Sequence, residues 1–229
     1  MKKLIFILSG FFFFIFTAFY GEGFKAVSVT DVKIYANTDI PSVKSYVEFP
    51  SSWNICRETH QEPFEKILDK LPSSLYDQRI EVRYTSINST MNVRPTVWSL
   101  IFRSRDNRKY VIRINDDAYF KGVRYNDVSV RAKAGLWAHE MMHVKDYKNR
   151  GFFGVLQRGW QYLSKSGKQS FEEEIDQMVI DYGLGYYLLH WAWFVLEESN
   201  ASDSYKEYKR NIYMTPDEII EYKELSTDV

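Results

Sequence analysis

The sequence has a single cysteine, Cys56, so the chain cannot form an internal disulfide bond and must be stabilised by core packing. Basic and acidic side chains are equal in number, 30 of each, so the chain as a whole offers no basic field for nucleic acid. Histidine is scarce, with four in 229 residues, and no internal repeat appears. These shortages exclude a disulfide-rich scaffold and a repeat protein, and they argue against nucleic-acid binding.

Residues 1–22 have the composition of a targeting segment. Lys2 and Lys3 precede an apolar run, Leu4–Tyr20, of about 17 residues, the lower limit for crossing a bilayer. No clear cleavage site follows, and no cysteine lies nearby for lipid attachment. We therefore expect a signal peptide or an N-terminal membrane anchor. In both cases the lysines favour the cytoplasmic side, so the rest of the chain is exported: secreted, periplasmic or membrane-anchored outside the cytoplasm.

Residues 23–229 are long enough for one domain with a substantial core, and nothing in them marks a second. Strand-like segments come first and helix-like segments later, which predicts an α+β fold. The expected strands are 26–35, 80–85 and a hairpin of 97–103 and 109–115 around a turn at 104–108. The expected helices are 63–71, 129–150, 153–162, 170–198 and 216–225, with a loop at 164–168.

Residues 139–143 read H-E-M-M-H, which is an H-E-x-x-H motif. Residues four apart lie on one face of a helix, so His139 and His143 can bind one metal ion. Glu140 lies beside that metal and can take a proton from a bound water, whose pKa zinc lowers toward about 7. The apolar flank 135–138 favours a buried amphipathic helix over two surface histidines. The motif therefore predicts the chemistry of a zinc peptidase.

A catalytic zinc site needs a third protein ligand, for which two arrangements are known. A histidine six residues after His143 is excluded, because that position is Asn149. A glutamate on a later helix fits this chain better. In residues 170–184 an apolar stripe at helical spacing would be buried, and Glu172 and Asp176 lie beside it on a shared face.

An H-E-x-x-H motif followed by E-x-x-x-D on a second helix resembles the gluzincin metallopeptidases, over about 50 residues of this chain. The resemblance implies that His139, His143 and Glu172 bind Zn²⁺ and that Glu140 is the general base. It also implies that Asp176 accepts a hydrogen bond from the far nitrogen of His139 and so fixes its tautomer. The zincin-like fold implied is a small, mainly antiparallel sheet packed on a helical half that carries both motif helices.

Three consecutive glutamates leave the third ligand open on the residues alone. Ser170 and Glu173 have the spacing of a capping box, which would place Glu173 at the start of the helix and leave Glu172 for the metal. Glu174 would then point to solvent. The alternative is that all three only favour a helix N-terminus through its dipole.

The remaining histidines, His60 and His190, are expected to pack rather than to bind metal. A donor for the oxyanion is also required. The candidates are Tyr147, Tyr182 and Tyr186, and the sequence does not choose among its 17 tyrosines.

Residues 109–115 form the strand that directly precedes the motif helix. We expect this strand at an edge of the sheet, where it could pair with an extended polypeptide substrate. Residues 184–196 form a second apolar run of about 13 residues, which is short of a membrane span. A core helix is expected there, and an interfacial helix resting on the membrane is the alternative.

Two functions fit these features. The first is a zinc-dependent peptidase that hydrolyses peptide bonds by a metal-bound water, with Glu140 as general base. The second is a non-catalytic zincin-like module that binds a peptide or protein and uses the metal as a brace. Glu140 favours the enzyme, because a binding module needs no base beside an open metal position. The expected partners are a polypeptide substrate and, through residues 1–22, a membrane, but no nucleic acid.

Overall fold

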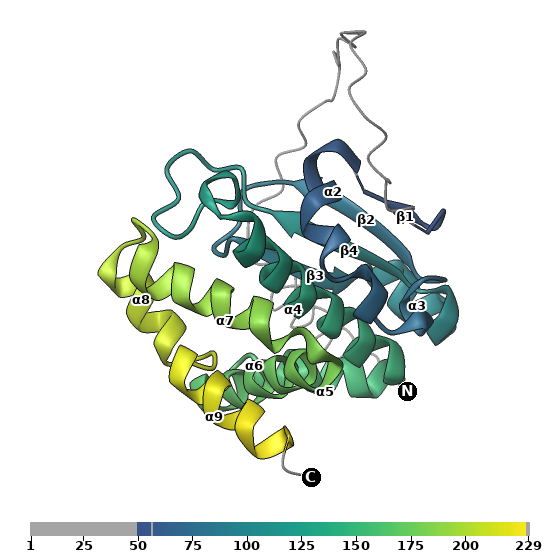
Figure 1. Ribbon diagram of the computed structural model, residues 1–229. Helices are drawn as coiled ribbons and strands as arrows, with labels where there is room; N and C mark the ends of the chain where they lie inside the picture. The colour runs from purple at the N-terminus through teal and green to yellow at the C-terminus, as the bar shows by residue number, and fades with distance from the viewer. Residues whose placement is uncertain (1–49, 56, 228–229) are drawn as a thin grey trace, which may run out of the picture. The chain divides into compact units, whose positions relative to one another are not determined.

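Four strands form a mixed sheet, which lies in the upper part of the α+β fold in Figure 1. In this computed structural model of the protein, residues 50–55 and 57–227 are described. The strands are β1 (Trp53–Asn54), β2 (Arg79–Tyr84), β3 (Met91–Pro95) and β4 (Lys109–Ile114). Their order is β1-β2-β4-β3; β1, β2 and β4 are parallel and β3 is antiparallel to β4. The predicted targeting segment 1–22, the predicted strand 26–35 and Cys56 lie outside the described residues.

The expectation of a mainly antiparallel sheet is wrong, because β3 and β4 form its one antiparallel pair among the described strands. The predicted hairpin fails at residues 97–103, where the chain forms helix α3 (Val97–Phe102) instead of a strand. Leu100 is buried, whereas Trp98 and Phe102 are 75% and 69% exposed. In a strand these three side chains would share one face, so their different burial follows the helical period. The antiparallel partner of β4 is therefore β3, which precedes α3.

The alternation along the strands separates an apolar face of the sheet from a polar face. The polar face carries Glu81, whose carboxylate pairs with both Arg83 and Lys109. The apolar face belongs to the same core as the helices and carries Ile80, Val82, Met91, Val93, Tyr110, Ile112 and Ile114. The sheet therefore presents one face to the helical half, which carries the H-E-x-x-H motif.

The predicted helices occur in the predicted order with several changes of boundary, and helix α8 was not predicted. The α-helices are α2 (Arg57–Glu65), α3, α4 (Val130–Asn149), α5 (Phe152–Gln161), α6 (Lys165–Val179), α7 (Gly185–Trp193), α8 (Asp203–Arg210) and α9 (Pro216–Thr227). Short 3₁₀ turns lie at Leu68–Lys70, Ser73–Leu75, Arg105–Asn107 and Tyr125–Asp127, and π-helical turns at Ile180–Leu184 and Phe194–Glu198. Helices α4, α5 and α9 lie where the sequence predicts, whereas α2 begins and ends earlier than the predicted 63–71. A capping box precedes α9: the backbone N–H of Thr215 donates to the Glu218 carboxylate at 2.7 Å, and the Thr215 hydroxyl accepts the N–H of Glu218 at 3.4 Å.

The predicted loop at 164–168 is wrong, because α6 already begins at Lys165. Ser164 is its N-cap, and the Ser164 hydroxyl accepts the backbone N–H of Gly167 at 3.1 Å. The predicted helix 170–198 is also interrupted. Gly183 has a φ of 72°, in the left-handed region that favours glycine, and this residue separates α6 from α7.

Helix α4 lies between the sheet and the other long helices (Figure 1). It contacts β3, α2, α6 and α7. The approach to α7 is close because Gly135 has no side chain: a Cβ there would lie 2.0 Å from the carbonyl oxygen of Tyr187. Helix α7 buries Leu188 and Trp191, as expected of a core helix.

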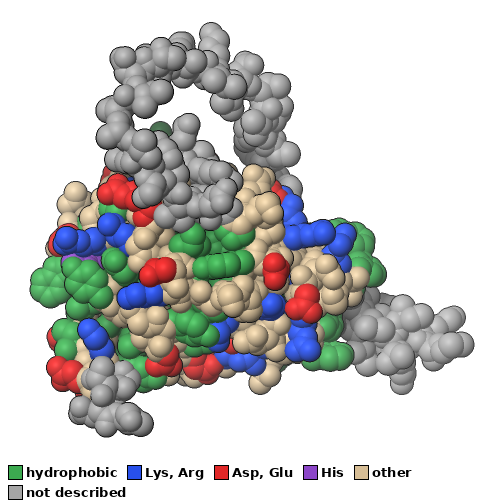
Figure 2. All heavy atoms as spheres, turned by 45° about the vertical axis from the view of Figure 1, so that its right-hand side comes forward, with side chains coloured by type: hydrophobic (Ala, Val, Ile, Leu, Met, Phe, Trp, Pro, Cys, Tyr) green, Lys and Arg blue, Asp and Glu red, His purple; other side chains and the backbone are tan. Residues whose placement is uncertain are grey.

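The surface carries charges of both signs. Figure 2 shows acidic and basic side chains interspersed over one face of the molecule. Of the helices in the described part of the chain, none is both long and apolar enough to cross a membrane.

Candidate metal centre

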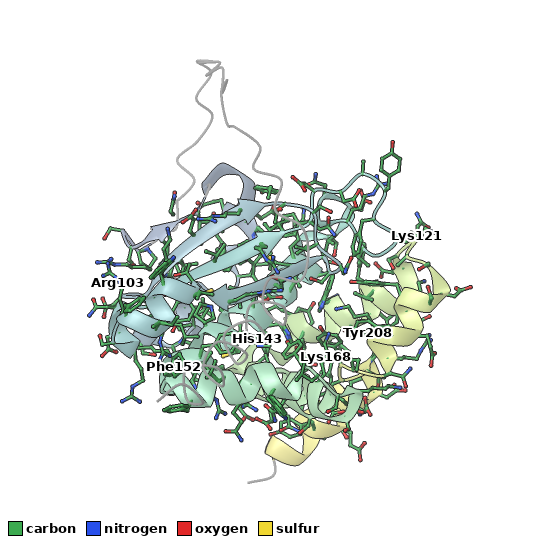
Figure 3. All side chains as sticks on the ribbon, turned by 180° about the vertical axis from the view of Figure 1, so that it is seen from behind. Arg103, Lys121, His143, Phe152, Lys168 and Tyr208 are labelled. Carbon is green, nitrogen blue, oxygen red and sulfur yellow. The ribbon has the colours of Figure 1, made fainter. Side chains whose placement is uncertain are left out.

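His139 and His143 lie side by side on α4, one helical turn apart. The Ser129 hydroxyl caps the start of this helix by accepting the N–H of Ala132 at 3.4 Å. The two imidazole centroids are 4.7 Å apart and the two Nε2 atoms 3.1 Å apart. Both side chains are buried, although histidine carries polar atoms on both sides of its ring. Figure 3 shows His143 between the strands above and the helices below.

Glu172 on α6 completes the group. Its Oε2 lies 3.1 Å from Nε2 of His139 and 3.2 Å from Nε2 of His143. In a tetrahedral zinc site with bonds of about 2.0–2.1 Å, ligand atoms are about 3.3 Å apart, so the observed triangle has nearly the right size. All three side chains are buried, and the group could hold a metal ion. Two imidazole nitrogens and a carboxylate oxygen are a donor set that zinc accepts.

Asp176, one turn after Glu172, orients the first histidine as predicted. Its Oδ1 lies 2.7 Å from Nδ1 of His139, so the ring donates there and keeps the lone pair of Nε2 for a metal. Its Oδ2 accepts the backbone N–H of Met214 at 3.1 Å. Burial alone would lower the pKa of His139, but Asp176 and Glu172 outweigh it and raise that pKa to about 10. The pair of carboxylates therefore makes this imidazole a strong base, for which a metal competes with a proton.

Glu140 is buried beside the group without belonging to it. Among the described residues, its Oε2 has no hydrogen-bond partner. Burial raises the pKa of Glu140, and the neighbouring His143 and His139 oppose that rise. A buried carboxylate with a free oxygen and a raised pKa is suited to accept a proton.

The other two glutamates of the run have roles different from those predicted. Ser170 lies inside α6 rather than at its start, so the predicted capping box with Glu173 is wrong. Glu173 instead accepts a hydrogen bond from Gln169 at 2.8 Å on the outer surface. Glu174 is half exposed and pairs with the Arg158 guanidinium at 2.5 Å, rather than only facing solvent.

A buried ion-pair network lies behind the group. Asp146, one turn after His143, is 2.9 Å from the guanidinium of Arg158 and 2.9 Å from that of Arg150. The Arg158 guanidinium also lies 4.2 Å from the ring centroid of Phe171, which is in edge contact with His143. The network joins α4, α5 and α6 behind the site, and no sequence motif predicts it.

Three tyrosines surround the group, of which the sequence indicated one. Tyr147 is the predicted candidate for the oxyanion donor that lies at the group: its ring stacks on that of His143 with centroids 6.0 Å apart. The other two candidates have ring contacts elsewhere among the described residues. The ring of Tyr182 contacts Lys145, and that of Tyr186 contacts His190.

The tyrosines that sequence reasoning missed are Tyr162 and Tyr213. Tyr162 is 38% exposed as a residue, but its hydroxyl donates to Oε1 of Glu172. The Tyr213 ring lies 5.6 Å from that of His139. Burial raises both tyrosine pKa values well above the usual value, and the charge of Glu172 adds to the rise. Both hydroxyls are therefore neutral donors beside the group.

His60 and His190 lie apart from the metal group, as predicted. His60 is fully buried, with Nδ1 2.8 Å from the Tyr125 hydroxyl and Nε2 3.1 Å from that of Tyr84. Burial and the charge of Lys133 lower the pKa of His60 to about 4, so it is neutral. His190 packs against Tyr186 with ring centroids 4.6 Å apart.

The expectation that residues 109–115 form an edge strand is wrong, because β4 lies between β2 and β3. Within the described residues the strand next to α4 at the end of the sheet is β3. The carbonyl of Thr90 accepts the N–H of Asn115, directly after β4, and the N–H of Thr96 donates to the carbonyl of Lys109 in β4. Alternate residues of an antiparallel pair bond to the partner, so the backbone groups of Met91 and Val93 point away from β4.

Comparison of the chain with protein-family models, with curated proteins and with solved structures gave no match. The site is therefore defined by its own geometry: a buried His-His-Glu group on two packed helices, with a carboxylate beside it.

Proposed function

We propose that the protein is a zinc-dependent peptidase in which His139, His143 and Glu172 hold the metal and Glu140 is the general base. The observation that carries this proposal is the triangle of ligand atoms, 3.1–3.2 Å on each side, next to a buried and unpaired carboxylate oxygen. A site that only braced the fold would have no use for that carboxylate, whereas hydrolysis requires a proton acceptor.

Different residues of the chain would have different roles in peptide hydrolysis. A bound zinc ion would lower the pKa of a water molecule toward about 7 and polarise the carbonyl of the peptide. Glu140 takes the proton of the attacking water and passes it to the amine of the leaving product, a role that its raised pKa favours. Tyr213 and Tyr162 are neutral O–H donors near the metal ligands and could stabilise the developing oxyanion.

The substrate would bind along β3. The N–H of Met91 and both backbone groups of Val93 could pair with an extended peptide, as in strand addition, whereas the Met91 carbonyl already accepts from the Ser89 hydroxyl at 3.1 Å. Because β3 packs against α4, a peptide paired there would pass close to the histidines of the motif. This places the strand-pairing role, predicted for residues 109–115, on the neighbouring strand.

Glu140→Ala tests the mechanism. It should retain zinc and fold, because Glu140 is not a ligand, but should hydrolyse peptides roughly 10²-fold or more slowly, the scale of general base catalysis. Metal content and the initial rate on a quenched fluorescent peptide mixture should be measured on the same preparations. Glu173→Ala, which removes an outer carboxylate of α6, is the matched control and should keep the wild-type rate. Equal rates for Glu140→Ala and wild type would reject the mechanism.

A further inference from the structure

Two lysines lie over the tyrosines that surround the metal group. Lys168 on α6 has its Nζ 4.9 Å from the ring centroid of Tyr162 and 5.0 Å from that of Tyr208, and it donates to the Tyr208 hydroxyl. The hydroxyl of that same Tyr162 donates to Glu172. The ammonium of Lys168 is therefore separated from a metal ligand by a single tyrosine. Figure 3 shows Lys168 and Tyr208 on one side of His143.

Lys209 on α8 approaches the same group from another element. Its Nζ lies 3.9 Å from the ring centroid of Tyr213, and that ring lies 5.6 Å from the ring of His139. Lys209 also borders a small cavity that is lined by Asp176, Trp191 and Tyr213 among others.

Neither lysine forms an ion pair within 4 Å with a carboxylate of the described residues. The acidic side chains nearby already have other partners. Glu173 accepts from Gln169, and Glu207 accepts from Asn211 at 2.7 Å. The lysines are instead held by aromatic rings, which attract a cation without neutralising it. Two ammonium groups beside the metal group thus remain able to receive an anion.

We infer that Lys168 and Lys209, with the hydroxyl of Tyr208, form a subsite for a carboxylate of the peptide substrate. The inference rests on the proposed function, and it names the substrate class as peptides with a carboxylate close to the scissile bond. That carboxylate is either an Asp or Glu side chain or the C-terminus of the peptide. The lysine ammonium groups and the tyrosine hydroxyl can donate hydrogen bonds to a carboxylate. The positive charges of the lysines would repel a basic side chain of the substrate at the same position.

The test compares matched peptides that differ at one position. A neutral parent peptide, its Gln→Glu and Gln→Lys counterparts at each position, and forms with a free or an amidated C-terminus are assayed for kcat/KM. The same peptides, labelled, are assayed for binding to the Glu140→Gln protein by fluorescence anisotropy. One acidic form should be favoured roughly 10-fold or more over its neutral counterpart, the size of a hydrogen bond to a charged group. The preferred position or terminus identifies the source of the carboxylate.

Variants then assign the preference to the two lysines. Lys168→Met and Lys209→Met keep the side-chain length and should each lower the acidic preference, whereas Lys168→Glu combined with Lys209→Glu should favour the Gln→Lys peptide. Lys145→Met is the control. The Nζ of Lys145 also lies over a tyrosine ring, 5.1 Å from the centroid of Tyr182, but Lys145 projects from a different side of α4 than His143. Thermal unfolding of each variant shows that it is folded.

The possible outcomes separate the two proposals. Hydrolysis without a charge preference, or a preference unchanged in both methionine variants, overturns the subsite and leaves the peptidase. Charge-dependent binding without hydrolysis of any peptide overturns the peptidase and keeps the subsite.

Discussion

The carboxylate of Asp176 holds two parts of the molecule at once. It accepts from the ring of His139 and from the backbone N–H of Met214, which lies just before α9. Removing it would leave a buried N–H unpaired and would free the imidazole to take the other tautomer. Glu172 differs from it, since its oxygen is one of the three ligand atoms. The two carboxylates, four residues apart, should therefore give different losses.

Three alanine variants of α6 distinguish these roles. Glu172→Ala leaves two protein ligands and should lose zinc on mild dialysis. Asp176→Ala should bind zinc roughly 10- to 100-fold more weakly. Glu173→Ala should retain it, with unfolding free energy within about 0.5 kcal/mol of wild type, because the hydrogen bond that Glu173 accepts from Gln169 is exposed. Metal content of the three proteins is measured side by side. If Glu172→Ala kept zinc and Glu173→Ala lost it, the third ligand would be Glu173 and the assignment to Glu172 would be wrong.

The spacing of residues on one helix is what the sequence could predict at this scale. His139 with His143, and Glu172 with Asp176, are each four apart, so helical geometry alone puts each pair on one face. The helix start was misplaced because Ser164 and Ser170 both suit an N-cap, and in the structure it is Ser164 that caps the helix. Contacts between elements, such as the tyrosine hydroxyl on Glu172, leave no periodic pattern in the sequence.

At the scale of elements, the placement of the two histidines depends on how α4 packs. Its neighbours α6 and α7 are joined through the left-handed Gly183, which lets the chain turn between them. Helix α7 then lies so close to α4 that only glycine fits at position 135. Since Glu172 is on α6, a displacement of α7 from α4 would disturb the helical half that carries the whole metal group.

Gly135→Ala measures that close approach. In an ordinary helix interior this change stabilises by about 1 kcal/mol, because alanine has the higher helix propensity. Here the added Cβ would lie 2.0 Å from the Tyr187 carbonyl oxygen, so the sign should reverse. We expect a loss of about 1–3 kcal/mol or more in unfolding free energy, the cost of overpacking a core. Urea unfolding of the variant and wild type gives the value.

Gly151→Ala is the control for this substitution, because a Cβ there would meet nothing within 4 Å. It should lower the unfolding free energy by less than about 1 kcal/mol, because Gly151 is the N-cap of α5 and alanine caps a helix less well than glycine. A Gly135→Ala protein as stable as wild type would show that α4 and α7 are less closely packed than described.

The type of an element could be predicted where the helical period repeats over many residues. The order of the strands in the sheet could not be predicted. The 20 residues of α4 carry a cap and an apolar flank, and the sequence located this helix. Helix α3 has only six residues, and over so short a segment the apolar patterns of a strand and of a helix cannot be told apart in the sequence. The burial of its side chains in the structure distinguishes them. That one misassigned segment changed the partner of β4 and therefore the edge strand of the sheet.

For the molecule as a whole, the proposed site must be delivered to its substrate. The chain carries 30 basic and 30 acidic side chains, and both signs are interspersed on the face that Figure 2 shows. The apolar run after Lys2 and Lys3 remains the sequence feature that predicts export. A peptidase with this segment would act outside the cytoplasm.

A topology reporter fused after Val229 tests the export prediction. The fusion should be active with a reporter that works only outside the cytoplasm, and inactive with one that works only inside. Replacing Leu4–Tyr20 by a polar segment of equal length should reverse this result, because the apolar run is then lost. Full activity of the cytoplasmic reporter on the unaltered chain would reject the prediction.

The stability of the folded molecule should decrease in acid through His60, which lies away from the metal group. The imidazole is fully buried between Tyr125 and Tyr84, and it contacts the ring of Trp137. Burial, with the charge of Lys133, lowers its pKa from 6.5 to about 4 in the folded protein. Between these values the unfolded chain binds the proton and the folded chain does not, so unfolding is favoured as the pH falls.

His60→Gln isolates this contribution, because glutamine can form hydrogen bonds but does not titrate. The unfolding free energy of wild type should fall between pH 6.5 and 4, with at most about 3 kcal/mol of the loss due to His60. The variant is less stable at neutral pH, since two tyrosine hydroxyls lose their fitted partner, but its decline with acid should be shallower. Urea unfolding is measured with a chelator present throughout, so that loss of metal does not contribute. Parallel declines for the two proteins would mean that His60 is not the group that titrates.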